Sequence, residues 1–390
     1  MVGGGYGGAT AAKYLRLLSD RRIEVTLVEP EPDFVSCPLS NLVVGGMRTM
    51  ADITRPYDGL VERWGVRRVR ERATAIDADR RRVRLASGAT LAYDRLVLAP
   101  GVDMLWDEVQ GSRAANAAGT VLHAWKAGPE TAALHRQLEA MADGGVCAIV
   151  IPETPYRCPP GPYERACLVA AYFRRAKPKS KLLIVDANGD VTSKGALFKK
   201  AWAELYPGMI EYRPEFKAVA VDAAARTVKF EVQEDLRADV LNLLPPMRAG
   251  DLAVQAGLAN ANGRWCQVDF LSYESTVAKD IHVIGDAIQV AQAMPKSGHM
   301  ANSHAKVCAA AIVARLAGWE VDPQPMLGNT CYSFVSADEA VHVASVHHYA
   351  AAQKTMLPVP GAGGLSAARN AEEARLAQAW AANIWSDMLE

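Results

Sequence analysis

The sequence predicts an α/β protein with two Rossmann-like dinucleotide-binding domains and a C-terminal α+β domain. A glycine-rich turn near the start of the chain leads into a helix, a second strand–helix–strand pattern begins near residue 145, and residues 326–348 alternate like strands. From these observations we place the first domain at residues 1–112 and 250–318, the second at 113–249 and the C-terminal domain at 319–390.

The composition is that of an ordinary globular protein. Hydrophobic residues make up 50% and charged residues 22% of the 390 residues, and 43 Lys plus Arg balance 43 Asp plus Glu. A net charge of zero gives no argument for a nucleic acid partner. No apolar run approaches the roughly 18 residues that a membrane-spanning helix needs. The seven cysteines form no C-x-x-C pair and no metal-ligand spacing, so neither a haem attachment motif nor a metal site is expected.

The first motif is the turn Gly3-x-Gly5-x-x-Gly8, which leads into a helix-forming segment. In a dinucleotide-binding turn the first glycine permits a tight turn, the second lets the backbone approach a pyrophosphate and the third lets the helix pack on the sheet. The strand Ile23–Glu29 follows, and Glu29 lies about 20 residues after the turn, where an acid binds the adenosine ribose. The candidate nucleotide-binding residues are therefore Gly3, Gly5, Gly8 and Glu29.

The start of the sequence is unusual. Only Met1 and Val2 precede the turn, whereas a dinucleotide fold needs a strand of about five or six residues there. We therefore expect the natural chain to begin upstream, together with any export signal.

Two later strand ends indicate that the nucleotide is FAD rather than NAD. One buried strand ends in Ala99-Pro100-Gly101 and another in Gly285-Asp286, where an acid can hold the ribityl chain of a flavin. Together they resemble the strand ends of flavoprotein reductases with two dinucleotide domains, the glutathione reductase-like disulfide reductases. The candidate FAD-binding residues therefore also include Ala99, Gly101, Gly285 and Asp286.

The second strand–helix–strand unit lacks a nicotinamide-binding turn. Its strand Val146–Ile151 leads into the proline-rich segment Pro152–Pro162 instead of a second G-x-G-x-x-G. Proline has no N–H group to offer a phosphate, and its ring blocks close approach. We infer that no nicotinamide cofactor binds there and that electrons enter from another donor. Cys158 lies in this segment.

Cys158 is held in a loop that the neighbouring prolines make rigid, although an inert buried thiol is the alternative interpretation. A second cysteine, Cys331, lies far away in the sequence in the polar segment Asn329–Ser333. A disulfide between the two would close a long loop and would be redox-active if strained or exposed. The sequence alone does not establish this pairing.

With these residues assembled, the chain resembles the flavoprotein subunit of flavocytochrome c sulfide dehydrogenases over nearly its whole length. The resemblance rests on the Gly3–Gly8 turn, Ser36–Asn41, Tyr156–Arg165, Asn329–Ser333 and the closing segment Ala368–Trp385. The segment around Cys158 is specific to that family, whereas the glycine turn is not.

The resemblance implies roles for three cysteines and one acid. Cys37 would be bonded covalently to FAD, Cys158 and Cys331 would form a redox disulfide beside the flavin ring, and Glu164 would be an acid/base near that disulfide. Lys296 precedes a helix that lies near the flavin in related folds and would stabilise the reduced flavin. The alternatives are a core cysteine for Cys37, a helix N-terminal acid for Glu164 and a solvated lysine for Lys296. The remaining cysteines are expected to be structural: Cys147, Cys167, Cys266 and Cys308.

The resemblance also implies an activity. Hydrosulfide would attack the disulfide, in our preferred order at Cys158, and two electrons would pass by way of Cys331 to FAD. A separate cytochrome c subunit carrying haem c would accept them, and the protein would be periplasmic.

Three other functions stay open: a membrane-associated sulfide:quinone reductase, an NAD(P)H-dependent flavoprotein reductase and a non-catalytic flavin-binding scaffold. The segment Leu365–Glu390, a predicted amphipathic helix, carries charges that favour packing on the protein over a membrane anchor, which argues against the quinone reductase. The prolines of the second unit argue against an NAD(P)H-dependent enzyme. The combination of Cys37, Cys158 and Cys331 argues against a scaffold.

Overall fold

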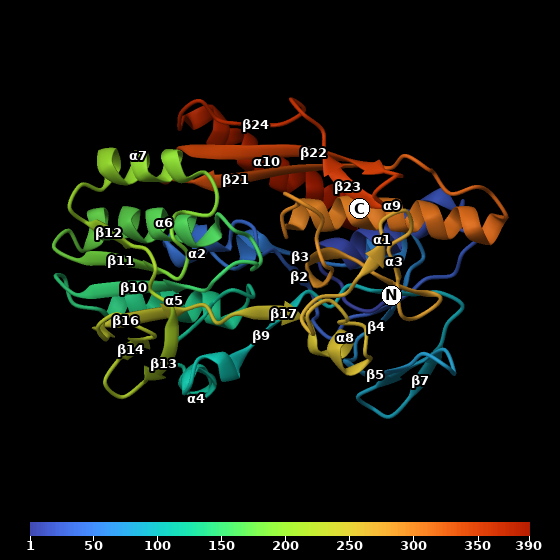
Figure 1. The fold of residues 1–390 in the computed structure, drawn as a ribbon, viewed down its shortest axis with the longest axis horizontal. Helices are drawn as coiled ribbons and strands as arrows, with labels where there is room; N and C mark the ends of the chain where they lie inside the picture. The colour runs from blue at the N-terminus through green and yellow to red at the C-terminus, as the bar shows by residue number, and fades with distance from the viewer.

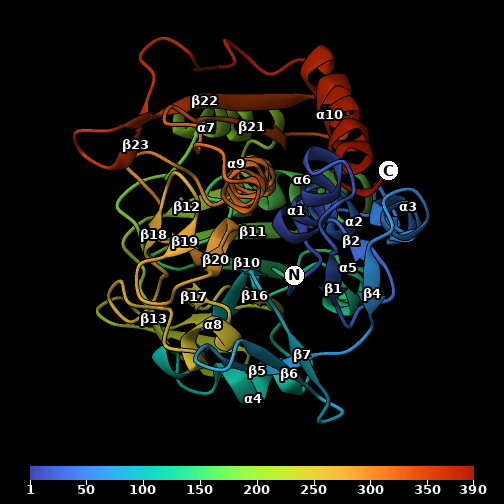
Figure 2. The same ribbon diagram turned by 90° about the vertical axis from the view of Figure 1, so that its right-hand side faces the viewer.

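The first unit is a parallel sheet flanked by two long helices, in a computed structural model that describes residues 1–390. Val2 forms parallel bridges to Val28 and Leu98, so the first residues occupy the middle of the sheet. The strands are β1 (Thr26–Val28), β4 (Arg67–Val69), β8 (Leu96–Leu98) and β20 (Ile281–Val283), extended by antiparallel β18 (Val268–Asp269) and β19 (Glu274–Ser275). Helices α1 (Tyr6–Leu18) and α9 (Gly298–Ala317) pack against each other beside it (Figure 2).

Shorter elements surround this sheet. The segment after residue 73 forms an antiparallel sheet of β5 (Ala73–Asp77), β6 (Arg82–Leu85) and β7 (Thr90–Ala92). The chain leaves the unit through β9 (Val102–Met104) and returns through β17 (Met247–Ala249), which pair antiparallel. The remaining elements are β2 (Phe34–Val35), α2 (Ser40–Val44), η1 (Ala51–Ile53), β3 (Thr54–Arg55), α3 (Asp58–Glu62), η2 (Trp106–Glu108), α8 (Asp251–Gln255) and η3 (Gly285–Ala287).

The second unit has its own four-stranded parallel sheet in the order β12-β11-β10-β16. Its strands are almost continuously buried because helices and a small antiparallel sheet cover both faces. The strands are β10 (Val146–Ile151), β11 (Lys181–Asp186), β12 (Ile210–Arg213) and β16 (Val240–Leu243). The covering elements are α4 (Ser112–Ala117), α5 (Pro129–Ala140), α6 (Gly161–Ala176), α7 (Gly195–Leu205), β13 (Ala218–Asp222), β14 (Thr227–Phe230) and β15 (Leu236–Arg237).

The C-terminal unit is an antiparallel sheet and one helix that lie across the other two units (Figure 1). It consists of β21 (Met326–Phe334), β22 (Ala340–Ala350), β23 (Thr355–Pro358), β24 (Gly364–Leu365) and α10 (Ala371–Leu389). The helix predicted from Leu365 begins only at Ala371, because Leu365 pairs with β22 and Asn370 caps the helix through the N–H group of Glu373 at 2.8 Å. None of the helices is both long and apolar enough to cross a lipid bilayer.

Helix α10 ties the end of the chain back to its start. The Tyr14 hydroxyl donates to Asp387 at 2.7 Å, and the Trp385 indole donates to the Tyr6 hydroxyl at 3.1 Å. A hydrophobic cluster of 78 buried residues includes side chains from all three units, for example Leu27, Ile149 and Met388. The units therefore share one core, which fixes the loops between them.

Candidate active site

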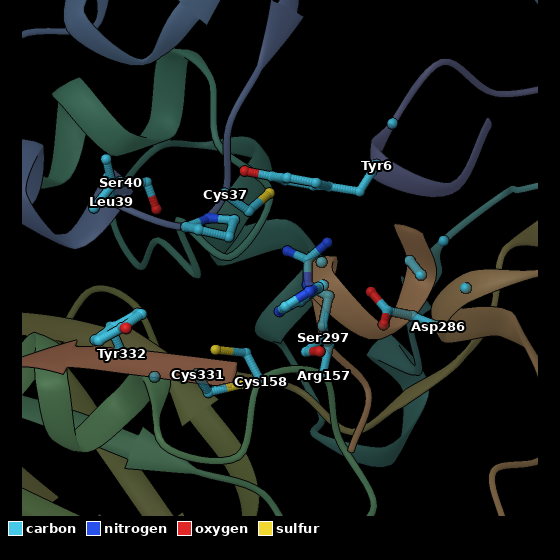
Figure 3. Close-up of a pocket in the computed structure, with 18 of the residues that line it drawn as sticks. Tyr6, Cys37, Leu39, Ser40, Arg157, Cys158, Asp286, Ser297, Cys331 and Tyr332 are labelled. Carbon is cyan, nitrogen blue, oxygen red and sulfur yellow. The ribbon is translucent and has the colours of Figure 1, made fainter. Parts of the chain in front are cut away.

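One cavity lies where the three units meet. It is lined by the start of α1, the segment before α2, the loop before α6, η3 and strand β21 (Figure 3). Of the residues predicted to form the site, Gly5, Cys37, Ala99, Gly101, Cys158, Glu164, Gly285, Asp286 and Cys331 line it. Segments far apart in the sequence therefore contribute to a single site.

The glycine turn has the close contacts that only glycine permits. Gly3 has φ +93°, and a Cβ atom on Gly8 would lie 1.7 Å from the carbonyl oxygen of Gly3. Around Gly5 there is no atom within 4 Å of such a Cβ, which leaves space above the start of α1. Glu29 does not line the cavity, but its carboxylate accepts the N–H group of Gly4 at 2.6 Å. This geometry fits a pyrophosphate at a helix N-terminus.

Asp286 lines the cavity and has a buried oxygen, Oδ1, without a hydrogen-bond partner. Burial raises the pKa of Asp286, and the neighbouring Arg157 and Lys296 oppose that rise. A buried acceptor without a partner is rare in native proteins and indicates a missing donor. The hydroxyl groups of a ribityl chain would supply that donor, so these residues fit FAD.

Cys37 lies at the upper edge of the cavity in Figure 3. Its sulfur accepts the N–H group of Ala127 at 3.5 Å, and its charge, when ionised, would raise the pKa of the neighbouring Arg157. Arg157 extends between Cys37 and the other two cavity cysteines (Figure 3). Cys37 is half-buried at a cavity wall, which does not fit the alternative of a core cysteine.

Cys158 is held in a left-handed backbone conformation, with φ +58°. Its N–H group donates to the Lys296 carbonyl at 2.8 Å, and its own carbonyl accepts the N–H group of Gly161 at 2.9 Å. Such a conformation costs about 1–3 kcal/mol for a residue other than glycine and persists only where the surroundings enforce it. The loop therefore fixes the sulfur toward the cavity.

Cys331 reaches the same part of the cavity from β21, and its side chain lies beside that of Cys158 (Figure 3). Both are free thiols in the structure. Desolvation, followed by the nearby Cys331 and Glu164, raises the pKa of the Cys158 thiol. The two sulfurs are adjacent, and the disulfide between them stays a prediction.

Glu164 combines the two roles that the sequence left open. It lies in the first turn of α6, and it also lines the cavity beside the cysteines. Its carboxylate accepts the Asn41 amide at 2.7 Å and the Phe334 N–H group at 2.8 Å. Burial raises the pKa of Glu164 despite these two donors.

Lys296 precedes α9, as expected, and its role in stabilising the reduced flavin stays a prediction. It is 3% exposed, so the solvated lysine is wrong, and its ammonium does not line the cavity. It donates to the carbonyls of Asp286 at 2.8 Å and Ile288 at 2.6 Å and lies 3.6 Å from the centre of the Trp265 ring. Burial lowers the pKa of Lys296 to about 7. Its backbone, rather than its charge, contacts Cys158.

Sequence reasoning missed several residues that hold the site together. Arg165 is 1% exposed and donates to Asn41 at 2.9 Å and to Asn242 at 2.8 Å, with its guanidinium 4.8 Å from the centre of the Trp125 ring. Lys194, 6% exposed, contacts the strand that carries Cys331. Lys194 belongs to no motif, and Arg165 is only the last residue of the segment around Cys158, so only the fold reveals their contacts. The cysteines expected to be structural are each at most 1% exposed: Cys147, Cys167, Cys266 and Cys308.

Three family models match successive parts of the chain. Residues 131–245 match the model described as sulfide dehydrogenase (flavocytochrome c) flavoprotein chain, central. Residues 323–389 match flavocytochrome c sulphide dehydrogenase, flavin-binding. Residues 1–127 match pyridine nucleotide-disulphide oxidoreductase.

Two curated relatives differ in how much of the chain they match. The chain is 65% identical over 43 residues to the sulfide dehydrogenase (flavocytochrome c) flavoprotein chain of Chlorobaculum thiosulfatiphilum, covering 11% of this chain and 88% of that one. It is 23% identical over 309 residues to the mitochondrial sulfide:quinone oxidoreductase of Mus musculus, covering 73% of this chain. The latter match spans 64% of the mouse protein, just under two thirds of its length.

Solved structures confirm the predicted fold class. The X-ray structure of the sulfide:quinone oxidoreductase from Aquifex aeolicus has a TM-score of 0.82 at 18% identity, covering 99% of this chain and 90% of that one. Putidaredoxin reductase, in its covalent complex with putidaredoxin, has a TM-score of 0.66 at 21% identity, covering 88% and 80%. The fold is therefore that of the pyridine nucleotide-disulfide oxidoreductases.

Proposed function

We propose that this chain, which belongs to the family of flavocytochrome c sulfide dehydrogenase flavoprotein chains, oxidises sulfide at a Cys158–Cys331 disulfide and passes the electrons through FAD to a cytochrome c subunit. The observation that carries the proposal is that both sulfurs lie in the cavity that also contains Cys37 and the unpartnered oxygen of Asp286. We place the protein in the periplasm and the haem c on the partner subunit, as the family implies.

FAD would be held by residues that line the cavity together with Gly3, Gly8 and Glu29, which do not line it. The Gly3–Gly8 turn would bind the pyrophosphate, Glu29 the ribose and Asp286 the ribityl hydroxyls, with Cys37 as the covalent attachment point. When bound, FAD supplies an acceptor that takes up two electrons and releases them one at a time.

The step that the protein's own side chains perform is thiol–disulfide exchange. Hydrosulfide attacks one sulfur of the pair, a new S–S bond forms, the Cys158–Cys331 bond breaks and the other cysteine leaves as a thiolate. The new persulfide retains the proton of hydrosulfide, and Glu164 accepts that proton. A carboxyl group with a raised pKa suits this exchange of protons near neutral pH.

The likeness to sulfide:quinone oxidoreductases favours a second candidate acceptor, a quinone. Helix α10 supports the cytochrome instead. Leu376 is 38% exposed, but most apolar residues of the helix are buried against the protein: Ala374, Ala377, Ala381, Ile384, Trp385 and Met388. Its outer surface carries the ion pair between Glu372 and Arg375 rather than an apolar face for a membrane.

The decisive experiment is anaerobic bleaching of the flavin by sulfide in C158S and C331S. We expect each variant to lose bleaching, whereas C308A, a change at a fully buried cysteine far from this chemistry, retains it. Reoxidation of the bleached wild type by a c-type cytochrome or by a soluble quinone analogue identifies the acceptor. Unchanged bleaching in both cysteine variants would rule the proposal out.

Covalent attachment has a separate test that needs no activity. We expect the denatured protein to carry the mass of one FAD, mapped to the peptide that contains Cys37, and the C37S variant to lack it. An unmodified wild-type peptide would restrict Cys37 to a non-covalent contact.

A further inference from the structure

Lys194 is a buried cation directly behind the strand of Cys331. It has φ +58° at the N-terminus of α7 and is 6% exposed. Its ammonium donates to the Cys331 carbonyl at 2.9 Å and to the Ser333 hydroxyl at 2.7 Å. A buried ammonium is costly unless negative charge or hydrogen-bond acceptors compensate it, so its position calls for a partner.

The ammonium lies on the face of β21 that carries the Cys331 sulfur. Alternate residues of a strand point to the same side, so Ser333, which binds the ammonium, and Cys331 share a face. Asn329 lies on that face too, with its amide 3.5 Å from the Cys331 sulfur. The Lys194 ammonium therefore contacts β21 on the face that carries the Cys331 sulfur.

The charges around the ammonium also indicate that Lys194 acts on Cys331. Desolvation lowers the pKa of Lys194, whereas Cys331, then Glu164, Cys158 and Glu373, raise it. Glu373 is itself paired with His342 at 2.7 Å. Cys331 is thus the strongest of the acidic groups that act on this ammonium.

The other nearby cations are engaged elsewhere. Arg165 donates to Asn41, to Asn242 and to the carbonyls of His123 and Ala124. Arg157 faces Cys158 too, but Cys37 and Asp286 act on it more strongly. Lys194 is therefore the cation placed to compensate a charge on Cys331.

We infer that Lys194 is a positioning residue that stabilises Cys331 as the thiolate when the Cys158–Cys331 bond opens. This inference rests on the proposed function and gives the exchange a direction. Hydrosulfide forms its bond to Cys158, the Cys158–Cys331 bond breaks, and its electron pair stays on the Cys331 sulfur beside the ammonium. Glu164 and Glu373 would oppose a second negative charge, which makes one fixed cation necessary.

The test measures the acidity of the thiols without sulfide. The wild type, K194M and K194R are reduced with a phosphine, and the rate at which iodoacetamide alkylates Cys331 is followed against pH by peptide mass. We expect K194M to move the midpoint of Cys331 alkylation to higher pH, as the loss of an adjacent opposite charge does. K194R retains the charge and should recover most of the shift. The matched control is K199M, on the same helix, where the lysine side chain is 47% exposed and pairs with Asp190.

Equal midpoints for Cys331 in the wild type and K194M would overturn the inference, as would a shift confined to Cys158. If K194M does not fold, S333A decides, because it removes one of the two groups that hold the ammonium in place. A higher midpoint in S333A supports the inference and an unmoved one overturns it. The alkylation experiment contains no sulfide, so an unmoved Cys331 midpoint leaves the proposed function intact. Persistent flavin bleaching by sulfide in C158S and C331S rejects the proposed function alone.

Discussion

The two strand–turn–helix units follow the same path, but their turns have different chemistry. The first turn consists of glycines, and α1 has no acid in its first turn, so its N–H groups remain available to a phosphate. The second turn contains prolines, and α6 carries its own acid, Glu164, in the first turn. There the buried ring of Tyr156 fills the loop, with its hydroxyl 3.0 Å from that of Thr192.

The acids that end the second strand of each unit differ in the same way. Glu29 is half-buried and accepts only the backbone N–H groups of Gly4 and Glu31. Asp186 is fully buried and accepts the Tyr163 hydroxyl at 2.6 Å and the Tyr212 hydroxyl at 3.1 Å. One unit therefore keeps its polar groups for a ligand, whereas the other uses them internally and presents a cysteine at the cavity.

The largest expected effect on stability comes from adding a side chain to the glycine turn of the first unit. In G8A the new Cβ would lie 1.7 Å from the Gly3 carbonyl oxygen, and backbone cannot move aside as a flexible side chain can. We expect the free energy of unfolding to fall by more than about 4 kcal/mol, or no soluble protein at all. The measurement is urea unfolding followed by circular dichroism.

The matched control lies in the second unit. Gly189 follows Asp186 and has no atom within 4 Å of an added Cβ. G189A should therefore stay within about 0.5 kcal/mol of the wild type. If G8A were as stable as G189A, the close packing of the first turn would be refuted.

A second pair of variants distinguishes the structural role of Asp186 from the ligand-binding role of Glu29. D186A removes the main acceptor of the buried Tyr163 hydroxyl and the acceptor of the half-buried Tyr212 hydroxyl, and should lower the free energy of unfolding by about 1–3 kcal/mol. E29A should change it by less than about 1 kcal/mol but weaken FAD binding, because its carboxylate is reserved for the ribose. FAD affinity is measured by fluorescence titration in a C37S background, where covalent attachment cannot hide the loss. Equal losses of affinity in the two variants would abolish the distinction.

Much of the fold follows from local patterns. The apolar run Val146–Ile151 is strand β10, residue for residue, because a buried parallel strand is hydrophobic on both faces. The start of α10 was placed too early because the pairing of Leu365 with β22 is a contact between distant segments, which no local pattern encodes.

The site was less predictable than the fold. The glycine turn and Asp286 follow strand ends, so topology alone brings them together. The approach of Cys158 and Cys331 joins a loop and a strand from different units, so the sequence left their pairing open and only the family resemblance implied it. Lys194 looks like an ordinary surface residue in the sequence, and Arg165 has no assigned role within the segment around Cys158. Their roles depend on burial, which three-dimensional packing decides.

The smallest expected effect concerns the acid that occupies the start of α6. Burial raises the pKa of Glu164 above its ordinary value of 4.5, so the folded state retains a proton that the unfolded state has lost. The free energy of unfolding therefore falls as pH rises from about 4.5 through that raised pKa. Glutamine carries no charge, so E164Q should become more stable relative to the wild type across this interval.

The quantity to compare is the change in the free energy of unfolding with pH rather than its absolute value. The amide of E164Q also changes the hydrogen bonds to Asn41 and Phe334 and so alters the absolute value. Urea unfolding at several pH values between 4.5 and 7 measures this change with pH. Glu153 is an exposed acid in the second turn, so the free energy of unfolding of E153Q should change with pH in the same way as that of the wild type. If that of E164Q also did so, the start of α6 would tolerate a negative charge without penalty. The start of α6 would then resemble the start of α1 more closely, because either helix N-terminus would accept the negative charge of a phosphate. Only the prolines would distinguish the two turns.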